Sequence, residues 1–115
     1  MLVFQKRKNK HTNYSSNYST CIIVYEIISE SCDINKLSDN IKKLGIWWKC
    51  IDSVWIVKSE LRAAGIRDIL IDNLADTDKL LVIELASEAA WTQSFPYPCK
   101  DWLKVHLGAR STVSL

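Results

Sequence analysis

The chain has 115 residues and a mass of 13.2 kDa, which is enough for one domain of ordinary size. Hydrophobic residues make up 48% and charged residues 24%, a balance that excludes a wholly disordered chain. The formal net charge is +2, but Lys6, Arg7, Lys8 and Lys10 supply four positive charges with no acid among them, which leaves 11 basic and 13 acidic residues elsewhere. Outside this run, a surface that binds nucleic acid by charge alone is not expected.

The chain lacks the signals of a membrane or secreted protein. No apolar run approaches the roughly 18 residues of a membrane-spanning helix, and the short apolar start precedes the basic run, the reverse of a secretory signal. The four cysteines, Cys21, Cys32, Cys50 and Cys99, form no CxxC pair. We interpret them as unpaired thiols of a cytosolic protein, so a cytoplasmic location without a membrane partner is expected.

The first predicted elements are a tail and a strand. Residues 1–19 are largely polar and basic and show neither helical nor strand periodicity after position 4, which predicts a disordered tail. Residues 21–28 are β-branched, aromatic and apolar on both faces, which predicts a buried strand that ends before Ser29. The folded domain is therefore expected over residues 20–108.

A helix and a hairpin are predicted next. The apolar residues of the helix recur on one stripe, while Asp33 is a suitable N-cap and Gly45 a suitable end; the stripe consists of Ile34, Leu37, Ile41 and Leu44. Residues 46–51 and 54–57 form two short strands around Asp52 and Ser53, too close in sequence for anything but an antiparallel hairpin.

The second half of the chain repeats the pattern of helix and strand. Ile66, Ile69, Leu70 and Leu74 give a second helix its apolar side, and residues 79–85 follow the turn 75–78 as a fourth strand. The order β, α, β, β, α, β predicts an α+β ferredoxin-like fold, a four-stranded antiparallel sheet with two helices on one face. A C-terminal extension follows, with a short helix over 99–107, and residues 109–115 are expected to fray.

Four short motifs connect residues 21–85 to a known family. They are Tyr25-Glu26 near the end of the first strand, Leu44-Gly45 after the first helix, the hairpin segment 52–55, and the segment 78–81 that opens the fourth strand. In order and spacing the chain resembles the small CRISPR-associated adaptation-scaffold and endoribonuclease proteins, most of all their uncharacterised stand-alone bacterial relatives, which carry tryptophans at positions such as Trp47, Trp48, Trp55 and Trp91.

The resemblance implies a homodimer with a metal-dependent phosphodiesterase site. In that family an aspartate at the end of the first strand of each protomer holds a divalent metal, and the matching residue here is Glu26. Carboxylate oxygens suit Mg²⁺, and a bound Mg²⁺ activates water, so Glu26 is the candidate metal ligand and catalytic residue, with Ser53 shaping the hairpin beside it. The alternative is an exposed strand-end carboxylate paired with a lysine or arginine.

Other residues carry two interpretations as well. Asp76 and Asp78 suit a shared cation, but turn chemistry explains them more simply. Trp47 and Trp48 must point to opposite faces of one strand, so one is expected in the core and the other at an interface or on the open face of the sheet, where it would stack on bases. We assign Trp48 and Trp91 to the interface.

These observations predict a dimeric nucleic-acid-binding protein of the CRISPR-associated scaffold type and a candidate Mg²⁺-dependent endonuclease. Lys6, Arg7, Lys8 and Lys10 are the candidate phosphate contacts, unless they belong to a solvated leader without function. The alternative function is a non-catalytic module that binds a protein partner or a small ligand through the open sheet face and the tryptophans.

Overall fold

The computed structural model describes residues 3–4, 18–86 and 88–107. Most of the predicted tail and the whole of the segment 109–115, which was expected to fray, lie outside the described residues. Within the described part of the chain, no helix combines the length and the apolar character needed to cross a membrane.

Four strands of six to eight residues form one antiparallel sheet: β2 (Ser19–Glu26), β3 (Gly45–Ile51), β4 (Val54–Ser59) and β5 (Lys79–Glu84). They lie in the order β3-β4-β2-β5, and the two-residue strand β1 (Val3–Phe4) adds to the outer edge of β3. The predicted α+β class with a four-stranded antiparallel sheet is confirmed, whereas β1 was not predicted.

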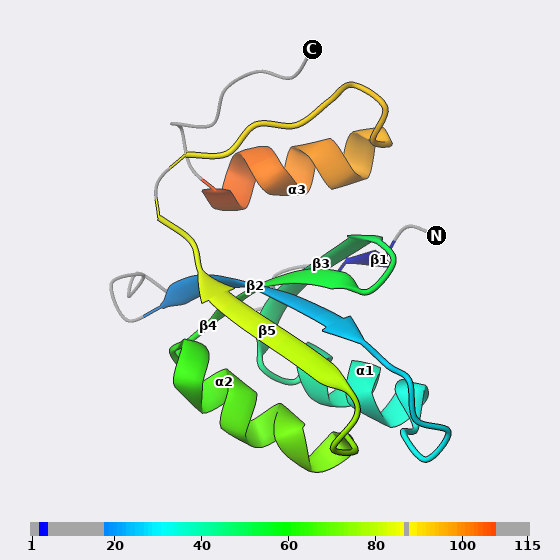
Figure 1. Cartoon of the computed structure of the whole chain (residues 1–115). Helices are drawn as coiled ribbons and strands as arrows, with labels where there is room; N and C mark the ends of the chain where they lie inside the picture. Colours follow the sequence, from blue (N-terminus) through cyan, green and yellow to red (C-terminus); the bar gives the residue numbers. More distant parts are fainter. Residues whose placement is uncertain (1–2, 5–17, 87, 108–115) are drawn as a thin grey trace.

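Helices cover both faces of the sheet (Figure 1). On one face lie α1 (Ile34–Lys42) and α2 (Ala63–Leu70), which continues into the 3-10 turn η2 (Ile71–Asn73). On the opposite face lies α3 (Tyr97–Leu107), at the end of the C-terminal extension. The sheet is therefore the middle layer of three.

Local sequence signals explain where α1 begins. The Asp33 carboxylate accepts hydrogen bonds from the backbone N–H groups of Asn35 and Lys36, at 3.0 and 3.2 Å, so the predicted N-cap is confirmed. Leu37 and Ile41, four residues apart, are completely buried against the sheet. The helix thus forms because its cap and its apolar stripe agree.

The larger hydrophobic core lies between the sheet and the two helices α1 and α2. The Trp55 side chain is completely buried there, and its Nε1 donates a hydrogen bond to the Tyr25 hydroxyl at 3.2 Å. The buried members of this core are Cys21, Ile23, Tyr25, Leu37, Ile41, Trp47, Trp55, Val57, Ile66 and Leu70.

A second, smaller core lies between the sheet and α3. Its buried members are Trp48, Ile56, Cys99, Trp102 and Leu103. Since Trp47 belongs to the larger core and Trp48 to this one, the two neighbours point to opposite faces of β3, as predicted.

The hairpin turn between β3 and β4 is two residues long, because Ile51 pairs with Val54. Ser53 takes up a left-handed backbone conformation there, with φ at 61°, and its carbonyl oxygen accepts a hydrogen bond from the Tyr25 N–H at 3.3 Å. The turn is thereby attached to the C-terminal end of β2.

Gly45 has a different role from the predicted one. We expected it to end the first helix, but α1 ends at Lys42 and Gly45 is the first residue of β3. A Cβ atom at this position would collide with the backbone carbonyl oxygen of Lys58 on β4. Glycine is required because two backbones approach each other closely.

Replacing Gly45 by alanine should therefore destabilise the fold by about 1–3 kcal/mol, the usual cost of an added methyl group in a packed site. Gly65→Ala is the matched control, since its Cβ would meet only Leu61 side-chain atoms at ordinary distances from 3.6 Å, within α2. Alanine in a helix should raise the free energy of unfolding by roughly 0.5–1 kcal/mol. Urea denaturation measures both effects, and equal stability of the two variants would contradict this role of Gly45.

Candidate functional site

Glu26 is the last residue of β2, and its side chain is exposed. Lys79, the first residue of β5, is its direct cross-strand neighbour, and Lys79 Nζ lies 3.2 Å from Glu26 Oε1. The ion pair between a strand-end carboxylate and a lysine, which was the alternative to a metal site at Glu26, is thus present. A solvent-exposed pair of this kind contributes at most about 1 kcal/mol, so it holds the Glu26 carboxylate only weakly.

A metal site at Glu26 is not preformed among the described residues. Among the described residues, no three His, Cys, Asp or Glu side chains lie close enough together to hold a metal ion. Mg²⁺ needs octahedral oxygen ligands and is usually held by one or two carboxylates. Glu26 supplies one of these and is open to solvent, so a second copy of the chain could add its own Glu26 carboxylate.

Glu26 stands at the end of a surface that we call the open-face ladder. It consists of three cross-strand pairs on the α3 side of the sheet: Ile22 with Ile83, Val24 with Leu81, and Glu26 with Lys79. Side chains at alternate positions of a strand share a face, so the ladder is continuous. Leu81 and Ile83 are 54% and 46% exposed. The site residue therefore borders an uncovered aliphatic surface.

The cover of this face decreases steadily from β3 to β5. Trp48, Ile56, Ile22 and Ile83 are successive cross-strand neighbours in one row. Trp48 and Ile56 are 3% and 6% exposed because α3 lies over them, whereas Ile83 is 46% exposed. Helix α3 thus covers about half of the face and leaves the β5 half open.

Asp78 fixes the loops beside Glu26. Its Oδ1 accepts hydrogen bonds from the backbone N–H groups of Ile28 and Ser29, both at 2.8 Å, and its Oδ2 accepts from the Ser29 hydroxyl and the Ala75 N–H. These hydrogen bonds, first those of the Ala75 and Ser29 N–H groups, hold the pKa of the Asp78 carboxyl well below its usual range. The structural interpretation of Asp78 is supported, although it joins two loops rather than one turn.

The two interface candidates both lie at the smaller core. Trp48 is buried under α3, with its ring centroid 5.9 Å from that of Phe95, and Trp91 packs against the same core while half-buried. Both therefore contact residues of their own chain. A contact between chains at these two residues stays a prediction.

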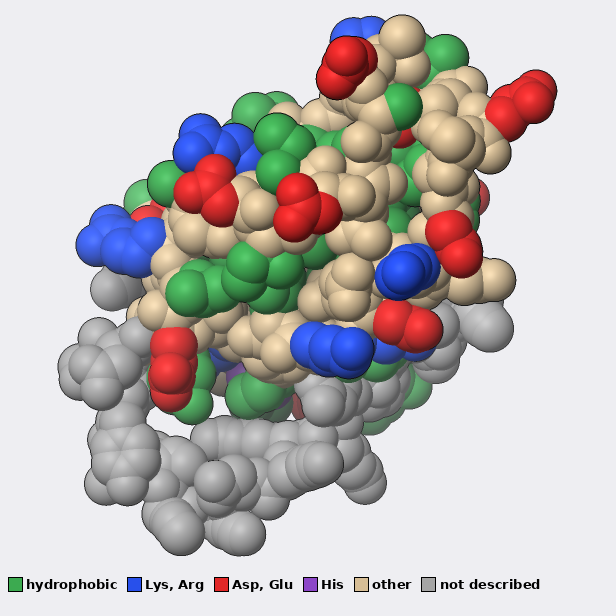
Figure 2. Space-filling view, turned by 90° about the horizontal axis from the view of Figure 1, so that it is seen from below, with side chains coloured by type: hydrophobic (Ala, Val, Ile, Leu, Met, Phe, Trp, Pro, Cys, Tyr) green, Lys and Arg blue, Asp and Glu red, His purple; other side chains and the backbone are tan. Residues whose placement is uncertain are grey.

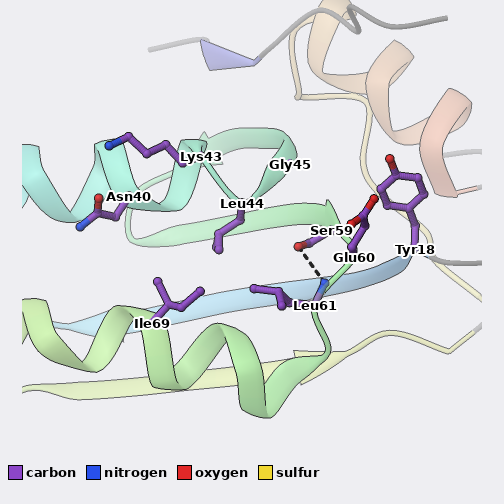
Figure 3. A pocket seen from close by; sticks show the side chains of 9 residues that line it. All are labelled: Tyr18, Asn40, Lys43, Leu44, Gly45, Ser59, Glu60, Leu61 and Ile69. Atoms are coloured by element: carbon purple, nitrogen blue, oxygen red, sulfur yellow. Dashed lines mark hydrogen bonds between the residues drawn. The ribbon is translucent and has the colours of Figure 1, made fainter. Parts of the chain in front are cut away.

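A pocket of about 390 Å³ lies between α1, α2 and the end of β4 (Figure 3). In this view the charged ends of Lys43 and Glu60 point away from the apolar side chains of Leu44, Leu61 and Ile69. Binding sites for small molecules usually have a few polar groups that converge on the ligand. Lys43 and Glu60 do not converge, so this pocket favours no particular ligand.

The candidate phosphate contacts Lys6, Arg7, Lys8 and Lys10 lie outside the described residues. The described residues carry 10 of the 15 basic side chains and all 13 acidic ones. On the face formed by α1 and α2, basic and acidic side chains are interspersed (Figure 2). Attraction of a nucleic acid would therefore depend on the N-terminal run rather than on this face.

Our interpretation of the cysteines was wrong for two of the four. Cys50 on β3 and Cys99 in the first turn of α3 form a disulfide. It was missed because a sequence separation of 49 does not indicate how far apart the two cysteines lie in the fold, and the packing of α3 on the sheet is what brings them together. Cys21 and Cys32 are free, and burial raises the pKa of both thiols.

The chain matches no protein-family model, no curated protein and no solved structure. The likeness to the CRISPR-associated proteins therefore depends on the short motifs alone.

Asp78 gives a prediction for the pH dependence of stability. Because its pKa is lowered in the folded state, its contribution is present above the unfolded pKa of about 3.9 and is lost as the pH falls below about 5 toward the folded pKa. Asp78→Asn should lower stability at pH 7 and flatten the loss of stability between about pH 5 and 2. Asp76→Asn, an exposed change in the same turn, is the control. Urea midpoints at each pH measure the effect, and parallel pH profiles for wild type and Asp78→Asn would refute this role.

Proposed function

We propose that this protein works as a homodimer directed at nucleic acid, of the CRISPR-associated scaffold type, with the open-face ladder as the contact between the two copies. The observation that carries the proposal is the exposure of Leu81 and Ile83 beside Ile22 and Val24 on a half-covered sheet face. A contiguous aliphatic surface of this kind is uncommon on a monomer and is typical of an interface.

The ladder suits a second copy of the same chain. Its centre is aliphatic and uncharged, while its end carries one acid and one base, Glu26 and Lys79. In a twofold contact the same surface must match itself, and a neutral centre with both signs of charge at its rim meets that requirement.

We also propose the ferredoxin-like fold assignment, supported by the order β3-β4-β2-β5 with α1 and α2 on one face. We propose a cytoplasmic location as well; the free Cys21 and Cys32 agree with it, and the Cys50–Cys99 disulfide agrees with it only as a reversible bond.

The nucleic-acid role is supported by the basic run and by the family resemblance. Strand β1 pairs with β3 at the edge of the sheet, and Lys6 follows its last residue by two positions in the sequence. Lys6, Arg7, Lys8 and Lys10 are the proposed phosphate contacts. The alternative function, a module that binds a different protein, uses the same open face and differs in the occupant.

Leu81→Asp should break the dimer, because it places a charge at the centre of an aliphatic contact. We expect the free energy of association to weaken by roughly 2 kcal/mol or more, the effect typical of a central interface residue. Ile71→Asp is the matched control, an equally exposed isoleucine in the helical layer. Light scattering over a concentration series gives the mass, and a single-chain mass for wild type at tens of micromolar would refute the dimer.

A second proposal is metal-dependent phosphodiester cleavage, and the place of Glu26 at the end of the proposed contact favours it. There, two Glu26 carboxylates from two copies would be able to share one Mg²⁺, provided that each gives up Lys79. The cost is small, since an exposed ion pair contributes at most about 1 kcal/mol. Mg²⁺ would supply an activated water, and Glu26 would hold the ion.

Glu26→Gln should abolish any Mg²⁺-dependent cleavage of single- or double-stranded nucleic acid while leaving the free energy of unfolding within about 1 kcal/mol of wild type. Glu84→Gln is the matched control, an exposed carboxylate on β5 that pairs with Arg62 at 3.0 Å. It should cleave like the wild type. Cleavage retained by Glu26→Gln, or lost equally in both variants, would contradict the assignment.

A further inference from the structure

Helix α3 is joined to the sheet by one covalent bond and a small set of contacts. Cys99, Trp102 and Leu103 are buried against the sheet, while Tyr97 and Val105 on the same helix are exposed. One buried hydrogen bond crosses this contact, from Trp48 Nε1 to the carbonyl oxygen of Cys99 at 3.2 Å. The Cys50–Cys99 disulfide lies at the same place.

One feature of the non-covalent packing of α3 lowers the stability of its docked position. Among the described residues, the Trp102 Nε1 atom is buried without a hydrogen-bond partner, which disfavours the docked position of α3. The helix has 11 residues, too few to be stable alone in water, so undocking and unwinding are coupled. Residues 88–96, which precede it, contain neither helix nor strand. The disulfide therefore decides much of the equilibrium between docked and undocked α3.

Release of α3 would change the surface on which the proposed dimer depends. Trp48 and Ile56 lie directly under the helix and continue the row formed by Ile22 and Ile83. Without α3, the open-face ladder would extend across the whole sheet to β3. Whether the face is partly or fully exposed therefore depends on whether α3 covers Trp48 and Ile56.

We propose that the Cys50–Cys99 disulfide is a reversible redox switch, in which the oxidised form holds α3 over Trp48 and Ile56 and the reduced form releases it and enlarges the surface that binds a second copy of the chain. The consequence for association rests on the proposed function. The reversibility of the bond rests on the proposed cytoplasmic location, since disulfides of cytosolic proteins are usually transient, catalytic or redox-sensing.

The reductant is a dithiol. One of its thiolates attacks the sulfur of Cys50, the more accessible partner, and Cys99 leaves as a thiolate that takes up a proton. The second thiol of the reductant then attacks the mixed disulfide, releases Cys50 as a thiol and closes the reductant's own disulfide. Two electrons and two protons pass from the dithiol to the protein.

Thiol counting and amide hydrogen exchange test the switch on the full chain. After purification in air and denaturation, two thiols, those of Cys21 and Cys32, should react, against all four after treatment with dithiothreitol. Reduction should speed exchange in 97–107 on the order of a hundredfold, because with the sheet still folded the disulfide closes a loop of roughly 15 residues between the end of β5 and Cys99, and a cross-link of that size typically has an effect of this order on opening. Exchange in β2 and β4 should stay unchanged. Four reactive thiols before reduction, or equal exchange of α3 in both states, would overturn the proposal.

Two variants serve as controls. Cys50→Ser combined with Cys99→Ser should show fast exchange of α3 with or without dithiothreitol. Cys32→Ser keeps the bonded pair and should respond to dithiothreitol like the wild type. A double variant that exchanges as slowly as the oxidised wild type would contradict the switch.

Light scattering of both redox forms separates this inference from the proposed function. Reduction should tighten dimerisation by about tenfold or more, since an exposed tryptophan anchor commonly contributes that much. A dimer that Leu81→Asp breaks but reduction leaves unchanged would overturn the redox control and leave the proposed function standing. A single-chain mass in every form would refute the proposed dimer, and the exchange of α3 would then decide whether the disulfide controls the helix.

Discussion

The packing of α3 determines how much aliphatic surface this protein exposes on the second face of its sheet. Helices α1 and α2 cover the first face through the larger core, which includes Trp55. On the second face, the described residues that cover the sheet belong to α3 and to the segment before it, and the cross-strand row from Trp48 to Ile83 changes from buried to exposed along its length. Because α3 buries Trp48 and Ile56 and leaves Ile83 exposed, the position of α3 sets how much aliphatic surface the sheet presents to solvent.

Glu26 is the proposed site residue, and its proposed chemistry depends on assembly. Within one chain it is a strand-end carboxylate in an exposed ion pair with Lys79. Its pairing energy is small compared with what a divalent ion gains from two carboxylates, so the ion pair does not prevent metal binding. Among the described residues, no group of three metal-ligating side chains surrounds Glu26, and a second copy of the chain would add another Glu26. For this reason dimerisation has to be measured before metal binding.

Local signals predicted most of the fold, and non-local contacts account for what was missed. The cap at Asp33, the stripe of α1 and the opposite directions of Trp47 and Trp48 each depend on residues close in sequence. Gly45 was assigned to the end of a helix because a sequence does not show that Lys58 approaches its backbone. The same limit applies to β1, whose partner is more than 40 residues away, and to the disulfide. At the site, the place of Glu26 at the strand end was predictable, but its pair with Lys79 needed the register of β5.

Hydrogen bonds hold one end of the open face, and a disulfide holds the other. At the Glu26 end, the Asp78 carboxylate attaches the loop after β2 to the turn before β5, and its low pKa keeps it ionised throughout the neutral range. Near β3, the Cys50–Cys99 bond attaches α3, and in the proposed switch the supply of reducing thiols determines whether this bond is closed. Under the proposed switch, the Glu26 end therefore stays constant at neutral pH while the α3 end varies with the redox state of the disulfide. A change in redox conditions would alter how much of the face a partner meets, without disturbing the loops that position Glu26.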